Sequence, residues 1–150
     1  MSSRTVLITQ AIVDALNGVT WSAAFTAART YGDHFSVPEL KAAGAIKVLV
    51  APRTREREYL DRSQERLDYE IDIGFFRHAP GDAAARLATG DGLVELVEEI
   101  EDWWMQRQIT VEGSKLTIIG SATAPVFDVE LVRDAGVFAS VLTLTLMEAA

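Results

Sequence analysis

The fold is decided by the stretch Val137-Phe138-Ala139-Ser140-Val141-Leu142-Thr143-Leu144-Thr145-Leu146, read together with the earlier stretch Tyr69-Glu70-Ile71-Asp72-Ile73-Gly74-Phe75. Both stretches alternate in character, which is the pattern of a β-strand that shows different side chains to its two sides. Neither carries a chemical group suited to catalysis. The sequence therefore indicates a protein built of sheets and surfaces, and the question of function becomes what the protein assembles with.

Length and composition indicate one domain that spans residues 1–150. Hydrophobic residues make up 49% of the chain, which is enough for a core and too many for a disordered protein. The 22 acidic residues outnumber the 14 basic ones, so the formal net charge is -8. Such a surface repels nucleic-acid phosphates and anionic lipids, which argues against a broad nucleic-acid-binding face and against docking to a membrane.

The chain contains no cysteine, which excludes disulfides, thiolate nucleophiles and cysteine-type zinc sites. The first residues, Met1 to Arg4, lead directly into an amphipathic segment and not into the apolar core of a signal peptide. No apolar run approaches the roughly 20 residues that cross a bilayer. We therefore expect a soluble protein that is made in the cytoplasm and has no membrane partner.

Local patterns predict two helices. Residues 5–17 carry one apolar stripe, with Ser3 or Thr5 as the N-cap and Gly18 as a left-handed residue at the end. Residues 93–107 carry the second stripe, and acidic side chains gather in its first half, where they suit the helix dipole.

The remaining patterns predict strands and loops. We expect strands at residues 20–31, 45–51, 67–77, 115–120 and 137–146, a helical turn at 37–41, loops at 79–92 and 121–125, a turn at 112–114, and a strand or irregular connector at 126–133. Residues 52–68 are predicted to form a long solvated hairpin that turns near Asp61-Arg62-Ser63. Hairpin-linked strands with two helices predict an α+β fold, in which a mainly antiparallel sheet has two helices packed on one face and a long protruding hairpin.

The predicted hairpin has an unusual density of charge. Its arginines are Arg53, Arg55, Arg57, Arg62 and Arg66, and they are interleaved with Glu56, Glu58, Asp61, Glu65 and Asp68. The acids nearly balance the arginines, and Tyr59 is the one aromatic residue among them. A solvated hairpin or a protein-docking arm is therefore favoured over a nucleic-acid-binding element.

The return strand of the hairpin has one apolar and one acidic side. Tyr69, Ile71, Ile73 and Phe75 are predicted to face the core. Asp68, Glu70 and Asp72 are predicted to share the opposite side, where three like charges in a row repel each other unless partners or solvent relieve them. The hairpin arginines can supply that relief, or the three acids can line an acidic surface.

Each group that could carry catalysis or bind a metal has a more ordinary interpretation. His34 and His78 lack metal-ligand spacing and are interpreted as loop residues. The pairs Glu98-Glu99 and Glu101-Asp102 are interpreted as a solvated helix face. Ser140 has no nucleophile elbow around it, and Gly90-Asp91-Gly92 is a weak signal for phosphate binding. We therefore predict no enzymatic activity, no catalytic or metal-binding residue and no cofactor.

The adjacent tryptophans Trp103 and Trp104 lie about 100° apart around a helix. Both fit one broad buried stripe. In the alternative, one is buried and the other presents a large apolar surface to a partner, as interface tryptophans often do.

The order of the patterns is more informative than any one of them. It runs through Val13-Asp14-Ala15-Leu16-Asn17, the Phe25 strand, Val37-Pro38-Glu39-Leu40, Lys47-Val48-Leu49-Val50-Ala51-Pro52-Arg53, Tyr69-Glu70-Ile71-Asp72-Ile73-Gly74 and Phe138-Ala139-Ser140-Val141-Leu142-Thr143-Leu144-Thr145. This succession, over nearly the whole chain, resembles the tail terminator (tail completion) proteins of long-tailed bacteriophages and of phage-like gene-transfer particles. The chain departs from the resemblance at Leu146-Met147-Glu148, where relatives often have an aromatic and a basic residue.

The resemblance implies a structural role. Proteins of this family have an α+β fold and form a ring, usually of six subunits, on the head-proximal end of the finished tail tube. The ring stops further polymerisation of the tube and offers a surface to the head side. For this chain the resemblance implies a homo-hexamer, assembled in the host cytoplasm and located in the tail or neck of the virion. Its implied partners are the major tail tube protein and a head-side connector or stopper, with DNA passing through the lumen without specific binding.

The hairpin supplies the candidate residues for this role. Candidates for the oligomer or tail interface are Arg53, Arg55, Arg57, Tyr59, Arg62 and Arg66. Candidates for an acidic lumen, which lets DNA slide past without sticking, are Asp68, Glu70 and Asp72. Charge reversal at the three acids is then expected to slow DNA ejection and to leave the assembly of the ring intact.

Three alternative functions stay open. The first is another neck component, such as a head–tail connector or stopper protein. The second is a small hydrolase that uses the acidic residues, and the third is a monomeric binding or adaptor module.

Overall fold

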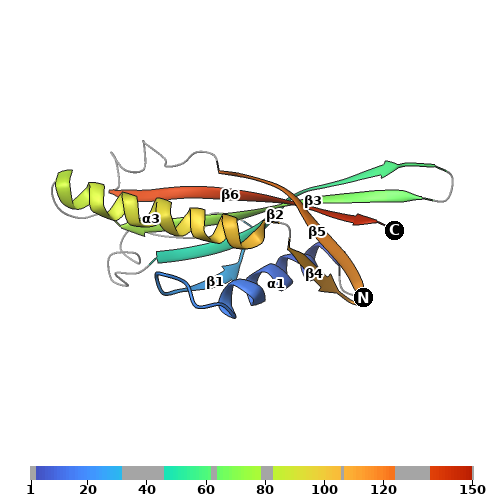
Figure 1. The fold of residues 1–150 in the computed structure, drawn as a ribbon, viewed down its shortest axis with the longest axis horizontal. Coiled ribbons are helices and arrows are strands. Elements are labelled where there is room, and N and C mark those ends of the chain that lie inside the picture. The colour runs from blue at the N-terminus through green and yellow to red at the C-terminus, as the bar shows by residue number, and fades with distance from the viewer. Residues whose placement is uncertain are drawn as a thin grey trace.

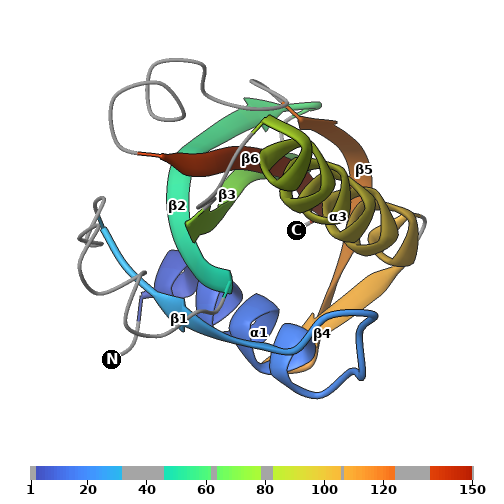
Figure 2. The same cartoon turned by 90° about the vertical axis from the view of Figure 1, so that its left-hand side faces the viewer.

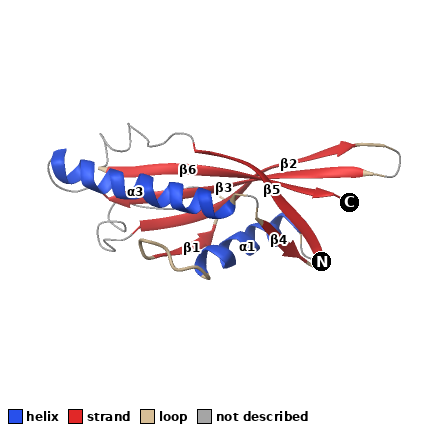
Figure 3. Ribbon diagram, in the orientation of Figure 1, coloured by secondary structure: helices blue, strands red, loops and turns tan. Residues whose placement is uncertain are grey.

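The computed structural model describes residues 3–31, 46–61, 64–78, 83–105, 107–123 and 136–149. Its elements are α1 (Arg4–Asn17), β1 (Phe25–Arg29), β2 (Ile46–Tyr59), β3 (Glu65–His78), α3 (Ala83–Trp104), β4 (Gln108–Val111), β5 (Ser114–Thr123) and β6 (Val137–Ala149). Figure 1 shows their arrangement, and Figure 3 shows the same view coloured by secondary structure. The predicted turn at 37–41, the connector at 126–133 and residues His34 and Arg62 lie outside the described residues.

The strands form one curled sheet in the order β1-β2-β3-β6-β5-β4. The β1–β2 pair is parallel and the other neighbouring pairs are antiparallel. Figure 2 shows the sheet end-on, with its two edge strands, β1 and β4, curving toward α1. Both helices pack against the sheet, so the predicted α+β fold with a mainly antiparallel sheet is confirmed.

The core lies on the side of the sheet that bears the helices, which we call the inner face. From β3 this face receives Tyr69, Ile71, Ile73 and Phe75, all of them fully buried as predicted. The helices cover these strand residues with their apolar stripes, which include Ile8, Ile12 and Leu16 of α1 and Leu93, Leu96, Ile100 and Trp104 of α3. The opposite side of the sheet, the outer face, receives the alternate residues, among them Asp68, Glu70 and Asp72.

Helix α1 is anchored at both ends by hydrogen bonds to the backbone. At its start the Ser3 carbonyl oxygen accepts a hydrogen bond from the Leu7 amide, while the Ser3 side chain makes no capping bond. At its end the Asn17 side-chain amide donates to the Ala27 carbonyl at 3.1 Å and accepts from the Ala27 amide at 2.8 Å, which attaches the helix to β1. The predicted left-handed conformation of Gly18 is wrong, because its φ and ψ are -88° and -7° and its amide bonds directly to the helix.

The predicted loop at residues 79–92 is wrong from Ala83 onward, because α3 begins there. Alanines at the start of this segment favour a helix strongly, and this propensity outweighs the two glycines. Gly90 is buried, and a Cβ added there would lie 2.9 Å from the Phe138 ring, so this glycine allows helix and strand to approach closely. Helix α3 ends at Trp104, before the predicted end at residue 107.

Three strands differ from those predicted from the sequence. The strand predicted at 20–31 is shorter in the structure and covers Phe25–Arg29. Strand β5 continues to Thr123, so part of the predicted loop at 121–125 is strand. Strand β4, which the sequence analysis did not identify, pairs with β5 across the predicted turn. Glu112 and Gly113 form that turn, and both have positive φ angles.

The three tryptophans of the chain meet in one aromatic cluster. Trp21 stacks on Phe25, and its ring centroid lies 5.6 Å from that of Trp103, edge to face. Trp104 is fully buried, whereas Trp103 is partly exposed and is covered by Trp21 and by the Arg107 guanidinium at 4.1 Å. Both tryptophans therefore pack within the molecule. Tyr31, in contrast, is 73% exposed.

Candidate functional site

The outer half of the β2–β3 hairpin projects beyond both helices. We call this part the arm and define it as residues 53–61 and 64–70. Its position at the far end of the molecule from α3 is clear in Figure 1. All nine residues from Arg53 to Asp61 are exposed. The predicted protruding hairpin is thus confirmed, and it turns between Leu60 and Gln64, as expected from the sequence.

Strand β6 supports most of the length of the arm on one side. Strand β6 pairs with β3 as far as Ala149, which lies opposite Arg66. On the other side, β1 ends its pairing at Val50. Among the described residues no strand pairs with this edge of β2 beyond that point. The arm therefore presents two faces and one free edge.

A β-bulge at the base of the arm decides which charges lie on which face. Pro52 pairs with Ile71 and Arg55 pairs with Tyr69, so β2 has one more residue than β3 between these pairs. A regular strand would continue the parity of Val48 and Val50 and would direct Glu56 and Glu58 to the inner face. The extra residue reverses the parity, so Arg55, Arg57 and Tyr59 lie on the inner face instead.

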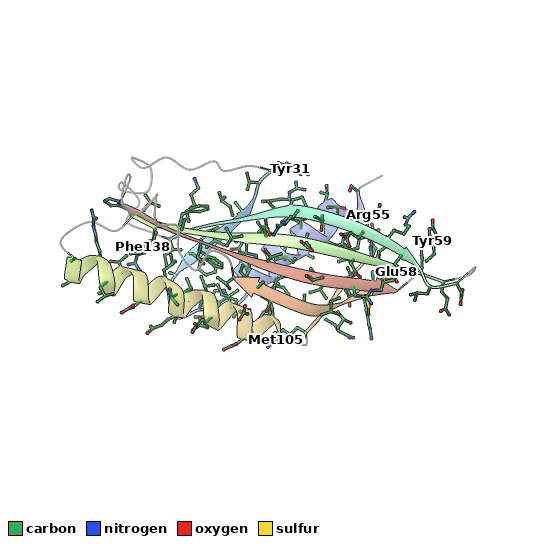
Figure 4. The ribbon with its side chains drawn as sticks, turned by 90° about the horizontal axis from the view of Figure 1, so that it is seen from above. Tyr31, Arg55, Glu58, Tyr59, Met105 and Phe138 are labelled. Carbon is green, nitrogen blue, oxygen red and sulfur yellow. The ribbon has the colours of Figure 1, made fainter. Side chains whose placement is uncertain are left out.

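The inner face of the arm combines positive charge with aromatic and apolar surface. The Arg55 guanidinium lies 5.8 Å from the centre of the buried Tyr69 ring, and Arg57 forms an ion pair with Glu65 at 3.4 Å. Near the turn, Tyr59 is 72% exposed and Leu60 is 57% exposed. Figure 4 shows Arg55, Glu58 and Tyr59 along the outer half of β2. Arginine and tyrosine are the residues that most often anchor protein interfaces.

The outer face of the arm is acidic but partly neutralised. Arg53 lies 3.8 Å from a Glu70 oxygen and 3.9 Å from an Asp72 oxygen. Arg66 binds Asp68 at 2.8 Å, and this hydrogen bond, with the charge of Asp68, raises the pKa of Arg66. Asp72 also accepts a hydrogen bond from Thr143 Oγ1 at 2.7 Å. The two arginines relieve the repulsion within the row of three acids.

The six candidate interface residues therefore do not form one patch. Arg55, Arg57 and Tyr59 lie together on the inner face, whereas Arg53 and Arg66 lie among the acids of the outer face. The sequence could not separate the two groups, because the bulge that divides them leaves no clear pattern in it.

A second charged surface lies on α3. Asp91, Glu95, Glu98 and Asp102 are exposed and follow each other at intervals of four, three and four residues, which places them in one stripe along the helix. We call these four residues the acidic stripe. Within the described part of the chain no ion pair or hydrogen bond involves their side chains.

The other acids of α3 have local partners. Glu99 accepts a hydrogen bond from the Ser22 amide at 3.0 Å, and Glu101 accepts one from Thr123 Oγ1 at 3.5 Å. The adjacent pairs noted in the sequence are therefore divided between internal contacts and a solvent-exposed stripe. An open groove of about 340 Å³ runs between α3 and β5, with Glu98 and Glu101 on its wall.

The remaining candidate groups have structural roles. His78 Nδ1 lies 3.1 Å from the Gly136 carbonyl oxygen, and Ser140 is buried on β6. No cluster of three His, Asp or Glu side chains that could hold a metal ion occurs among the described residues. No helix in the described ranges is long and apolar enough to cross a membrane.

Comparison with known proteins adds no relative to this description. No protein-family model matches the chain, and no curated protein matches it. The function must therefore be argued from the arm, the acidic stripe and the fold that holds them.

Proposed function

We propose that this protein is a virion structural protein that forms an oligomeric ring, with six subunits as the expected number. In this proposal the ring caps the head-proximal end of a phage or phage-like tail tube, stops the polymerisation of the tube, and joins the tail to the head or neck. The observation that carries the proposal is the arm, in which nine consecutive residues, 53–61, are exposed.

The arm supports an assembly role because its β2 segment is exposed along its whole length. Residues 53–61 are all exposed, yet strand pairing with β3 continues up to Tyr59. An exposed strand with a free edge is a template for unwanted pairing, and charged side chains with a bulge are common protections against it. A long arm of this kind is useful where a second molecule covers it.

The remaining features fit the proposal. The proposed partners are further copies of the chain, the major tail tube protein and a head-side connector or stopper. The net charge of -8 suits a ring through which DNA passes without specific binding. The proposed location is the tail or neck of the virion, after assembly in the host cytoplasm.

The first test is the mass and shape of the purified protein, measured by light scattering and negative-stain imaging with and without tail tubes. A ring that forms in solution or on tube ends is the expected result. If the protein stays monomeric and does not bind to tube ends, the result contradicts the proposal and favours the adaptor function.

The second test separates the terminator from its nearest alternative. Particles that lack the protein should have tails of non-uniform, excessive length. Tails of normal length that fail to join heads would instead identify a connector or stopper protein.

A further inference from the structure

The inner face of the arm and the acidic stripe are opposite in charge and are borne by different elements. The arm carries Arg55 and Arg57, of which Arg57 also forms an ion pair with Glu65 of the same face at 3.4 Å, and the stripe carries four exposed carboxylates. In Figure 1 the arm and α3 lie toward opposite ends of the molecule, so one molecule cannot bring them together. A contact between them has to join two copies.

The two surfaces also match in spacing. Arg55 and Arg57 are two residues apart on a strand, about 7 Å. Glu95 and Glu98, or Asp91 and Glu95, are one turn apart on a helix, about 5 to 6 Å. Beyond the arginines the arm ends in the exposed Tyr59 and Leu60, and beyond the acids α3 carries Leu87, which is 66% exposed. The path from Arg55 to Tyr59 is about 13 Å, and the path from Glu95 to Leu87 is about 12 Å.

We propose that the arm of one copy docks on α3 of the next copy. Arg55 and Arg57 then pair with Glu95 and Glu98, and Tyr59 and Leu60 lie against Leu87. This inference rests on the proposed self-assembly and names the surfaces that perform it. The contact is heterologous, because each copy uses its arm on one side and its α3 on the other, and heterologous contacts form rings when the rotation between subunits closes.

A competing acceptor for the arginines is the outer face of a neighbouring arm. That face also carries carboxylates, but Arg53 and Arg66 already pair with Glu70, Asp72 and Asp68. The acidic stripe has no such cations among the described residues. The unneutralised stripe is therefore the stronger electrostatic partner.

Charge exchange tests the contact. The variants R55E/R57E and E95R/E98R should each weaken self-association at least about tenfold, because they replace attraction with repulsion at two positions. The combination of all four substitutions should restore association, a result that altered stability of the monomer would not produce. The matched control is E56R/E58R, which reverses charges of the same strand on the outer face and should leave association unchanged. Sedimentation equilibrium measures all four proteins.

Cross-linking tests the register. The chain has no cysteine, so no native thiol competes with the two that are introduced. The variant Tyr59→Cys/Leu87→Cys should form, on mild oxidation, a ladder of covalent oligomers that ends at the size of the ring. The control Tyr59→Cys/Ile119→Cys, whose second site is 44% exposed on β5, should stay monomeric in a denaturing gel.

Two results would overturn this inference. If rings form and neither charge reversal weakens them, or if both cysteine pairs cross-link equally, the arm does not dock on α3 and the ring proposal survives. If the unaltered protein is monomeric both alone and with tail tubes, the inference and the proposed function fail together.

Discussion

Arg4 and Glu148 form an ion pair although they are 144 residues apart in the chain. Arg4 Nε donates to Glu148 Oε2 at 3.1 Å, and Nη2 donates to the same oxygen. Nη1 donates to the Val111 carbonyl at 2.8 Å, so one guanidinium joins the start of α1 to the ends of β4 and β6. The hydrogen bond to Glu148 raises the pKa of Arg4, against an opposing effect of burial.

Loss of Arg4 should destabilise the fold. Arg4→Met leaves the carboxylate of Glu148, a residue only 7% exposed, without its cation, and should lower the free energy of unfolding by about 2 to 3 kcal/mol. Because the pKa of Arg4 is raised on folding, its contribution is complete at neutral pH and is lost only as the pH rises through the folded value. Urea unfolding measures the effect.

The control for this change is Arg29→Met, which removes an exposed arginine from β1 and should cost less than about 0.5 kcal/mol. Arg4→Met/Glu148→Leu should recover part of the loss, since it removes the uncompensated charge as well. Equal stability of Arg4→Met and the control would show that the ion pair contributes nothing.

Substitution of alanine for two glycines of α3 should change stability in opposite directions. Gly92→Ala meets no described atom closer than Arg77 Nη1 at 3.9 Å and should raise stability by up to about 1 kcal/mol through helix propensity. Gly90→Ala makes the same gain but places its Cβ 2.9 Å from the Phe138 ring, so we expect a net loss. A comparison of the thermal unfolding of the two variants separates the effect of the contact with Phe138 from the effect of helix propensity. A neutral Gly92→Ala would argue that residues 83–92 are not helical.

Tryptophan fluorescence should report on the aromatic cluster alone, because this cluster contains all three tryptophans of the chain. Trp21→Ala uncovers Trp103 and removes the hydrogen bond from Trp21 Nε1 to the Leu16 carbonyl. We expect a red-shifted emission and a loss of about 2 kcal/mol. Tyr31→Ala, at an exposed aromatic beyond the end of β1, is the control and should change neither quantity.

Neutralising the acids of the outer face tests the proposed lumen. Asp68→Asn/Glu70→Gln/Asp72→Asn keeps the shapes of the side chains and removes the three carboxylates that pair with Arg53 and Arg66, so the face loses three negative charges. DNA ejection from assembled particles should then slow. Asp14→Asn removes an exposed carboxylate of α1, outside both proposed contact surfaces, and serves as the control for ejection. Normal DNA ejection from particles with the triple variant would show that the three acids do not line the lumen.

The sequence predicted the features that depend on local pattern. The alternation of Tyr69, Ile71, Ile73 and Phe75 predicted a strand with one buried side, and all four side chains are fully buried. The apolar stripes predicted both helices, and the run of alternating charges predicted the projecting hairpin. In these segments the local preference and the tertiary packing agree.

The features that the sequence did not predict depend on distant partners. The bulge at Arg53 is set by the pairing of β2 with β3, so the faces of Arg55 and Glu56 could not be read from the alternation alone. Gly90 suggested a loop, but its role is to admit the ring of Phe138, 48 positions later in the chain. Strand β4 has only four residues and forms because β5 lies beside it.

The separation of the arm from α3 has a consequence for mixed populations. A subunit with the substitutions R55E/R57E keeps an intact α3, so it can receive the arm of one neighbour but cannot offer a working arm to the next. A growing assembly that incorporates such a subunit keeps one open end and does not close. A minority of altered subunits should therefore inhibit assembly dominantly, as a chain-terminating monomer does in a polymer.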